Sequence, residues 1–249
     1  MKIVACYSAK GGVGKTATAV NLAYWCAARE RSTLLVDLDP QGASSFYFKA
    51  RPKAKNPGRK LLDSDTDLLD LIQQSEYPQL DILPAHKSFR KFDAALADDS
   101  RKHLAALLAD LEAHYDVLVL DCPPTMGPLA ENIFTAADWV LTPVIPTTLA
   151  ERAYEQLVTF FADKGWKPKR LRPFFTMVQA RKTLHRDTMQ AMRVRHERFA
   201  RVVVPHSRDV EYMGLRQAPL LSYAPKVPAA LAYHAVFIEH CGKLVRPVA

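Results

Sequence analysis

A glycine-rich loop near the start of the chain constrains its fold more than any other feature. The loop follows an apolar segment and precedes a run with helical spacing. Glycine lets the backbone curl so that its N–H groups point inward, and a helix N-terminus adds partial positive charge. A strand, such a loop and a helix in this order predict a phosphate-binding site. The loop residues are Lys10, Gly11, Gly12, Val13, Gly14, Lys15 and Thr16.

Apolar runs and helical patterns alternate along the rest of the chain. This alternation predicts parallel strands joined by crossover helices. We therefore expect an α/β fold with three layers, in which helices cover both faces of a mostly parallel sheet. The 249 residues are 49% hydrophobic, which is enough for a sizeable core, and no Pro/Gly-rich linker divides them. Residues 1–249 are expected to form one domain.

Apolar runs and helical spacing predict the individual elements. The expected strands are Lys2–Ser8, Thr33–Val36, Leu80–Leu83, Asp116–Leu120, Trp139–Val144, Phe174–Val178 and Val202–Val204. The expected helices are Gly14–Arg29, Leu61–Gln74, Ser100–His114 with Ser100 as its N-cap, Leu149–Phe161, Thr183–Ala200 and Ala229–Leu244. The basic, Pro/Gly-rich stretch Lys49–Lys60 is expected to be a loop.

The phosphate loop departs from the common GxxxxGK[ST] pattern. Position 9 is Ala9 where that pattern requires glycine, and Lys10 is an additional lysine before the paired glycines. In such a loop Lys15 would reach the β- and γ-phosphates of a nucleotide, and the Thr16 hydroxyl would ligate Mg²⁺. The sequence thus predicts a nucleotide site with two lysines.

Lys10–Thr16 resembles the deviant Walker A motif of the ParA/MinD ATPase superfamily. The resemblance continues at Leu34–Gly42, at Tyr115–Pro124 and at Ala137–Val144. It covers the first 160 residues well, is weaker beyond them, and is nearest to the small, Soj-like ParA ATPases. It implies a Mg²⁺-dependent ATP hydrolase that forms a homodimer when ATP binds.

The resemblance also implies roles for individual residues. Lys10 would contact phosphate across the dimer interface, and Asp39 would position the attacking water. Asp37 and Asp39 lie two apart at a strand end and so face the same side, while Asp121 ends another strand as a Walker B carboxylate. The candidate catalytic residues are Lys10, Lys15 and Asp39, and the candidate Mg²⁺ residues are Thr16, Asp37 and Asp121.

The nucleotide itself is expected to contact the loop and two later positions. Family members contact adenine after late strands, which matches Met177 and Pro205 here. The candidate ATP-binding residues are Lys10, Gly11, Gly12, Val13, Gly14, Lys15, Thr16, Ala17, Met177 and Pro205.

The four cysteines lie far apart, with no CxxC or Cys/His spacing typical of zinc sites. Cys122 directly follows Asp121, and iron–sulfur relatives use paired cysteines across a dimer. The surrounding Asp-Cys-Pro-Pro string is common in ParA-like proteins, so a packed structural cysteine is expected instead.

The basic charge is concentrated in one part of the chain. Residues 164–216 contain 14 Lys/Arg and 4 Asp/Glu, and the other residues carry a net charge of −2. Such a patch favours a polyanion partner, and contacts to phosphates would be insensitive to base sequence. The candidate residues for non-specific duplex DNA binding are Arg181, Lys182, Arg186, Arg193, Arg195, Arg208 and Arg216.

These observations favour a cytoplasmic, nucleoid-associated ATPase that segregates or positions a plasmid, chromosome or protein complex. By resemblance, a cargo-borne ParB-like or adaptor protein would stimulate hydrolysis. The chain begins at the first strand, so the N-terminal helix-turn-helix of larger ParA proteins is not expected. Alternatives remain a MinD-type membrane ATPase, which the Gly242 and Pro247 interruptions disfavour, and a metabolic or assembly ATPase. An acidic protein partner for the basic patch also stays open.

Overall fold

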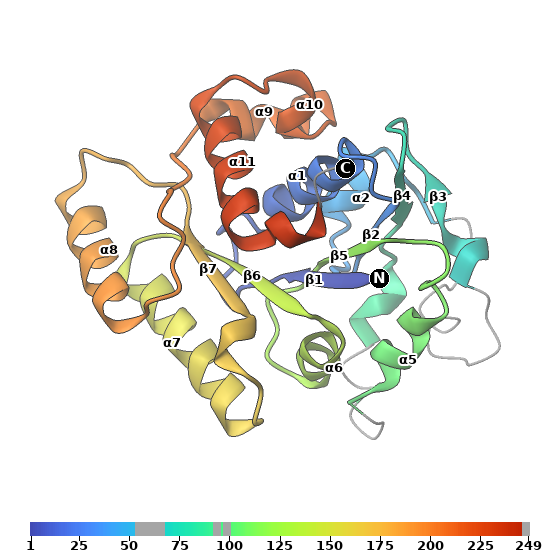
Figure 1. Cartoon of the computed structure of the whole chain (residues 1–249), viewed down its shortest axis with the longest axis horizontal. Helices are drawn as coiled ribbons and strands as arrows, with labels where there is room; N and C mark the ends of the chain where they lie inside the picture. Colours follow the sequence, from blue (N-terminus) through green and yellow to red (C-terminus); the bar gives the residue numbers. More distant parts are fainter. Residues whose placement is uncertain (53–67, 92–95, 97–100, 246–249) are drawn as a thin grey trace.

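The computed structural model describes residues 1–52, 68–91, 96 and 101–245 (Figure 1). In this described part, a seven-stranded sheet has the order β3-β4-β2-β5-β1-β6-β7. Adjacent strands run parallel, except that β3 is antiparallel to β4. The strands are β1 (Lys2–Cys6), β2 (Thr33–Asp37), β3 (Gln73–Gln74), β4 (Leu80–Leu83), β5 (Val117–Asp121), β6 (Trp139–Val144) and β7 (Leu171–Phe175).

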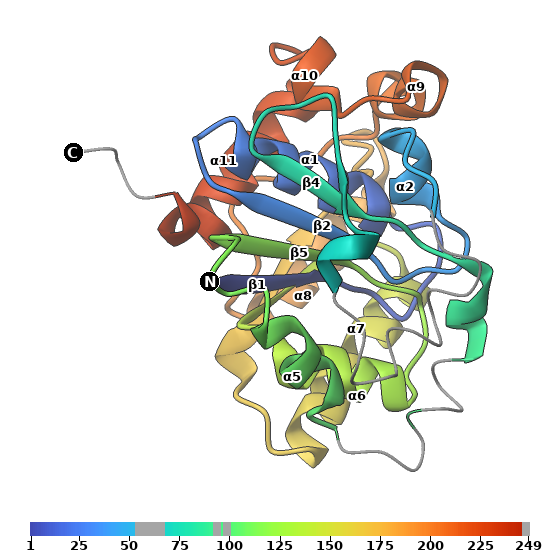
Figure 2. The same ribbon diagram turned by 90° about the vertical axis from the view of Figure 1, so that its right-hand side faces the viewer.

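Helices cover both faces of this sheet, which confirms the expected three-layer α/β fold (Figures 1 and 2). The α-helices are α1 (Lys15–Ala27), α2 (Ala43–Tyr47), α5 (His103–Ala109), α6 (Pro128–Ala136), α7 (Thr148–Asp163), α8 (Thr183–Arg195), α9 (Arg208–Arg216), α10 (Leu220–Tyr223) and α11 (Pro228–Cys241). Short 3-10 turns are η1 (Leu68–Leu71), η2 (Lys87–Lys91), η3 (Pro168–Arg170) and η4 (Gly242–Leu244).

Alternation along the central strand β1 divides the core into two layers. Val4 and Cys6 belong to the cluster under α1 and α11, whereas Ile3, Ala5 and Tyr7 belong to the cluster under α5, α6 and α7. Successive side chains of a strand point to opposite faces, so five apolar residues in a row serve both layers. A third cluster lies at the β7 edge, where α7 and α8 pack.

Parallel pairing brings the carboxyl ends of β1, β2 and β5 to the same edge of the sheet. Cys6 pairs with Asp121, and Asp121 pairs with Asp37. The phosphate loop leaves β1 at this edge, and the segment after Asp37 leaves β2 beside it. Ligands of open α/β sheets bind at such edges. Among the described helices, none is both long enough and apolar enough to traverse a bilayer.

Several sequence-based boundaries are correct. Leu80–Leu83 and Trp139–Val144 have the expected bounds, and α1 and α7 lie close to the predicted Gly14–Arg29 and Leu149–Phe161. The predicted N-cap Ser100 lies outside the described residues. The helix after it, α5, has Lys102 at its N-cap and ends at Ala109 instead of His114.

The predicted helix Leu61–Gln74 is wrong where it can be compared. Residues 61–67 lie outside the described part, Leu68–Leu71 form the 3-10 turn η1, and Gln73–Gln74 form the strand β3. Leu68 and Leu71 are three apart and both buried, so a single tight turn is enough to place them in the core. The apolar spacing was correct, but its interpretation as a long helix was not.

The predictions for the region after β6 need three corrections. The edge strand β7 begins at Leu171 instead of Phe174 and tolerates Pro173, which an edge strand allows. Helix α8 ends at Arg195 instead of Ala200 because His196 is extended and Phe199 turns inward to stack on Phe175 at 4.2 Å between ring centroids. Val202–Val204 form no strand in the described structure, and only an isolated Val178–Pro205 bridge continues the sheet there.

Phe134 of α6 is expected to be a strong determinant of stability. Its ring is fully buried and meets Tyr7, Phe161 and Trp166 at 4.7, 5.0 and 5.6 Å between centroids. Phe134→Ala should lower the free energy of unfolding in urea by about 3–5 kcal/mol, because it removes these contacts and leaves a cavity. Leu215→Ala, at a side chain that is 81% exposed, is the control and should change it by less than about 0.5 kcal/mol. Equal effects of the two substitutions would contradict the packing described.

Candidate functional site

The phosphate loop adopts a backbone that requires glycine at two positions. Gly12 and Gly14 have φ values of 72° and 86°, in the left-handed region that side chains disfavour. Gly14 is the N-cap of α1 and makes no side-chain cap, so the first N–H groups of α1 remain available to a ligand. A Cβ atom at Gly14 would lie 3.7 Å from Met177 Cε.

The two lysines of the loop make different contacts. Lys15 is only 8% exposed, and its Nζ donates to the backbone oxygen of Lys10 at 3.3 Å. Burial lowers the pKa of Lys15, and the nearby Asp121 opposes this shift. Lys10 Nζ instead donates to Thr147 Oγ1 at 3.4 Å, next to the start of α7. The Lys10 amine is therefore held by another element of the chain.

Asp37 and Asp121 are neighbours across β2 and β5, and both are fully buried. The chain itself satisfies the Asp37 carboxylate. Its Oδ2 accepts from Ser45 N at 2.8 Å and from Ser45 Oγ at 2.6 Å, and its Oδ1 accepts from Asp39 N at 3.2 Å. Asp37 thereby fixes the turn after β2 and the start of α2.

Asp121 has the opposite environment, because neither of its carboxylate oxygens has a hydrogen-bond partner among the residues that the structure describes. Burial, and then the charge of Asp37, raise its pKa to about 8; the nearby Thr16 and Ser44 hydroxyls oppose the rise only in part. The buried Ser44 Oγ likewise has no hydrogen-bond partner among the described residues. Unpaired buried polar atoms are rare in proteins and call for a ligand or another specific reason.

The oxygen atoms gathered here fit Mg²⁺. Mg²⁺ prefers oxygen ligands and is commonly held by one or two carboxylates together with substrate phosphates and water. Asp121 supplies an unsatisfied carboxylate, and Thr16 and Ser44 supply neighbouring hydroxyls. Within the described residues, no group of three His, Cys, Asp or Glu side chains forms a metal site alone.

Asp39 lies beyond this buried pair, in the turn that leads into α2. Its side chain is half-buried, and its Oδ1 accepts from Gln41 N at 3.0 Å. The negative charges of Asp121 and Asp39 both raise the pKa of Lys15, against the lowering that burial causes. The structure therefore brings Lys15, Asp37, Asp39 and Asp121 to one edge of the sheet, as the sequence predicts.

A small cavity beside the phosphate loop joins segments from the end of the chain. Met177 and Pro205 both line it, together with Gly14 of the loop. Met177 has a φ of 52°, and the Val178–Pro205 bridge holds the two segments together. The structure thus brings the predicted adenine-contacting positions next to the phosphate loop.

Sequence reasoning missed several residues at this edge. The prediction did not include Ser44 and Ser45 of α2, which interact with the two buried aspartates. It also did not include Glu211 and Tyr233, which line the cavity beside Met177. For the two serines the signal was their place directly after the Asp-Pro-Gln-Gly turn; for Glu211 no local pattern was available.

The four cysteines are free and buried. Burial raises the pKa of the Cys122 thiol well above its usual value, and its Sγ lies 3.4 Å from the Leu120 backbone oxygen. A neutral, enclosed thiol is unreactive. This geometry agrees with the expected structural role of Cys122.

The predicted DNA-contacting residues are in two groups, around α8 and on α9 (Figure 1). Arg181, Lys182 and Arg186 are exposed at the beginning of α8. Arg193 donates to the backbone oxygens of Ala200 and Arg201, and Arg195 pairs with Glu151 and Glu155 of α7. Arg208 and Arg216, at the ends of α9, lie over the rings of Tyr212 and Tyr223.

Comparison with known protein sequences identifies relatives of this chain. An AAA domain family model, AAA_31, matches residues 1–165. The chromosome partitioning protein ParA of Myxococcus xanthus is 37% identical over 146 residues, 57% of this chain and 52% of that protein, so this match spans about half the relative's length. The sporulation initiation inhibitor protein Soj of Bacillus subtilis is 29% identical over 93% of this chain and 95% of its own.

Solved structures share the fold over almost the whole chain. An ATP complex of Cyanothece McdA has a TM-score of 0.84 at 20% identity and covers 100% of this chain and 98% of its own. Cobyrinic acid a,c-diamide synthase of Mycobacterium smegmatis, with an ATP analogue and magnesium, has a TM-score of 0.78 at 28% identity and covers 94% and 91%. The family match and the glycine-rich loop agree: the chain belongs to the AAA_31 family and is a P-loop ATPase of the ParA/MinD superfamily.

Proposed function

We propose that this chain is a Mg²⁺-dependent ATP hydrolase that dimerises on ATP, binds duplex DNA without sequence preference and positions a cargo. The main observation in support is the unsatisfied Asp121 carboxylate beside Lys15 and the phosphate loop. The relationship to ParA and Soj supports the positioning role. A cargo-borne ParB-like or adaptor protein would stimulate hydrolysis, and the ATP-bound form would be associated with the nucleoid.

In this proposal the residues of the site divide the work. The N–H groups of the loop and Lys15 hold the phosphates, and Asp121 and Thr16 face the Mg²⁺ position. Asp37 lies beside that position, with its oxygens bonded to Ser45 and Asp39. Bound there, Mg²⁺ would neutralise charge on the phosphate oxygens. Asp39 accepts a hydrogen bond from the attacking water and orients it. Met177 and Pro205 contact the adenine.

Lys10 would link ATP binding to contact with a second copy of the chain. Its contact with Thr147 is a single long hydrogen bond of 3.4 Å, so little free energy is lost when the amine leaves it. A dimer that brings the partner's phosphates within reach of Lys10 would offer it a charge-assisted interaction instead. ATP would thereby become part of the dimer interface.

Arg181, Lys182 and Arg186 are exposed and form no ion pair within the described part of the chain, so they are candidates for contacts to DNA phosphates, with Arg208 and Arg216 as a second group. Arg193 and Arg195 are already engaged within the chain and primarily shape the end of α8. We therefore expect the first group to contribute more to DNA affinity than Arg193 and Arg195 do.

A second candidate function is ATP-dependent chemistry on a small molecule. The cobyrinic acid a,c-diamide synthase structures are 26–28% identical to this chain, closer in sequence than the McdA structure. The two functions differ in what ADP formation requires. DNA and a cargo adaptor would accelerate it in the first, and a carboxylate substrate would be required in the second.

Asp121→Asn should stabilise the ligand-free protein above neutral pH. The folded-state pKa of Asp121 is about 8, above the usual 3.8, so the folded protein binds the extra proton and loses stability as the pH rises between these values. Asparagine does not ionise, so the variant does not lose this stability as the pH rises. Urea unfolding in EDTA should show a gain in the variant that grows from pH 5 to pH 8. A pH-independent difference would contradict the assigned environment, and Mg²⁺-dependent ATP hydrolysis should fall in the same variant.

Asp39→Ala should hold the protein in its ATP-bound, DNA-bound state. Without the carboxylate that orients water, hydrolysis should fall about 100-fold or more, while ATP binding remains. DNA retention with ATP, measured by anisotropy of a labelled duplex, should then outlast that of the wild type. Lys15→Ala is the control and should lose both ATP binding and DNA retention. Normal hydrolysis by Asp39→Ala would remove Asp39 from the proposed mechanism.

The triple variant Arg181→Gln, Lys182→Gln, Arg186→Gln should bind DNA more weakly at every sequence. Each lost phosphate contact should reduce the slope of log affinity against log salt by about one. The comparison variant is Arg193→Gln with Arg195→Gln, and its slope should change less because those guanidinium groups already have partners. If the comparison variant loses more of the slope, the assignment of the DNA-facing group is wrong.

A further inference from the structure

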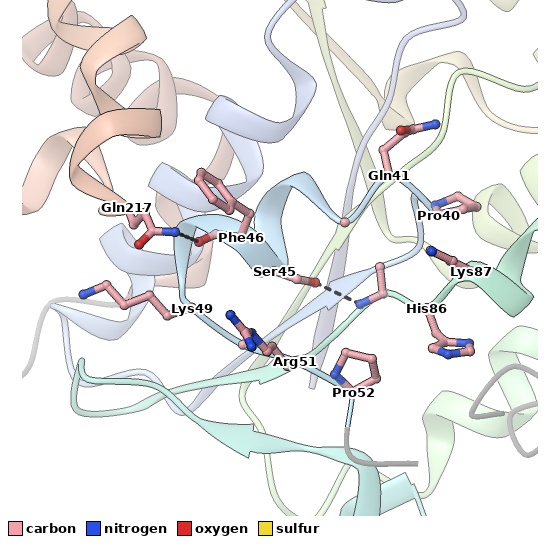
Figure 3. Close-up of a pocket in the computed structure, with 13 residues that line it drawn as sticks. Pro40, Gln41, Ser45, Phe46, Lys49, Arg51, Pro52, His86, Lys87 and Gln217 are labelled. Carbon is pink, nitrogen blue, oxygen red and sulfur yellow. Dashed lines mark hydrogen bonds between the residues drawn. The ribbon is translucent and has the colours of Figure 1, made fainter. Parts of the chain in front are cut away.

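A second, larger pocket lies beyond the turn that follows Asp39, with a volume of about 670 Å³ (Figure 3). This volume is in the range of small-molecule sites. Four separate segments build its wall: the turn Pro40–Gly42, the stretch from α2 to Pro52, residues 85–87 after β4, and Gln217 after α9. None of the phosphate-loop residues, nor Asp39 or Asp121, lines it.

The charged groups lining this pocket are all cationic. Lys49, Arg51 and Lys87 line it together with His86, and none of the described lining residues is Asp or Glu. In the view of Figure 3, Lys49 lies on one side and His86 and Lys87 on the other, with Arg51 between them. Three cationic side chains thus line one hollow, which favours an anion.

Within the described residues, Arg51 and Lys87 form no ion pair. Lys49 pairs with Glu76 at 3.4 Å, but both side chains are more than half exposed, and exposed pairs of this kind contribute little. The apolar lining includes Phe46, Pro40 and Pro52. Together with the cations, it suits an organic body that bears phosphate or carboxylate groups.

The pocket shares structural elements with the nucleotide site. Ser45 lines the pocket, and its Oγ both donates to Asp37 and accepts from Ala85 N at 2.9 Å. Gly42, with a φ of 69°, closes the turn directly after Asp39, and a Cβ there would lie 3.8 Å from Ala85 Cβ. A ligand against these residues contacts the same segments that hold Asp37 and Asp39 in place.

We propose that this pocket binds a small organic anion, phosphorylated or polycarboxylate, as an effector separate from the nucleotide. Its negative groups are held by Arg51, Lys87 and Lys49, and its body lies against Phe46 and the two prolines. Because no phosphoryl-transfer residue lines the pocket, the anion is not the group that reacts with ATP. Its effect on hydrolysis rests on the function proposed above; its binding does not.

The test uses the full chain with saturating ADP, so that the phosphate loop is filled. The probe is pyranine, an aromatic trisulfonate, followed by fluorescence anisotropy; inorganic pyrophosphate and tricarballylate compete with it as the phosphate and carboxylate arms. Arg51→Gln with Lys87→Gln should weaken pyranine binding about ten-fold or more, because two charge-assisted contacts are lost. Lys167→Gln with Lys169→Gln removes the same charge from the exposed turn before β7 and should have little effect.

Each outcome decides a separate point. A lack of pyranine binding in the presence of ADP would overturn the site. An equal loss of pyranine affinity in both double variants would overturn it as well. Displacement by only one competitor identifies the anionic group that the pocket takes. Where binding holds, that competitor should change the rate of ATP hydrolysis about five-fold or more in the wild type and not in the pocket variant. Binding without such a change would leave the site and overturn its role as an effector. A chain that hydrolyses no ATP but binds pyranine would contradict only the proposed function.

Discussion

The structure depends on the placement of two buried carboxylates side by side. Parallel pairing of β2 with β5 puts Asp37 opposite Asp121 at the last position of both strands. Two carboxylates on paired neighbouring residues in a buried environment repel each other when both are ionised. The chain satisfies Asp37 with donors from α2 and from the following turn and leaves Asp121 unsatisfied. This asymmetry gives Asp37 a structural role and leaves Asp121 without a partner among the described residues.

The neighbouring elements are arranged around this asymmetry. α2 provides Ser45 for Asp37 and Ser44 near Asp121, so one short helix contacts both carboxylates. α1 begins at Lys15, whose positive charge lies near both Asp121 and Asp39. At this edge of the sheet, hydrogen bonds within the chain hold Asp37, whereas the described residues offer none to Asp121.

Much of this arrangement could be predicted from the sequence, because its signals are local. The loop Lys10–Thr16 and the aspartates at strand ends follow from short motifs whose geometry is set by the strand before them. The bounds of β3 and of α8 could not be predicted in the same way. The end of α8 depends on Phe199 stacking against Phe175, and β3 depends on pairing with β4. Such tertiary contacts override local helical or strand propensity.

The Val178–Pro205 bridge has a consequence for the basic helix α8. Val178 N donates to Val204 O at 3.1 Å, and His206 N donates to Val178 O at 3.0 Å, so the segment that contains α8 leaves and returns at one point. That point borders the cavity beside Gly14. α8 therefore lies at the far end of a hairpin-like segment, residues 178–204, whose two ends meet beside the phosphate loop. Arg195 also joins α8 to Glu151 and Glu155 of α7, so the segment is held at its base and again along the helix.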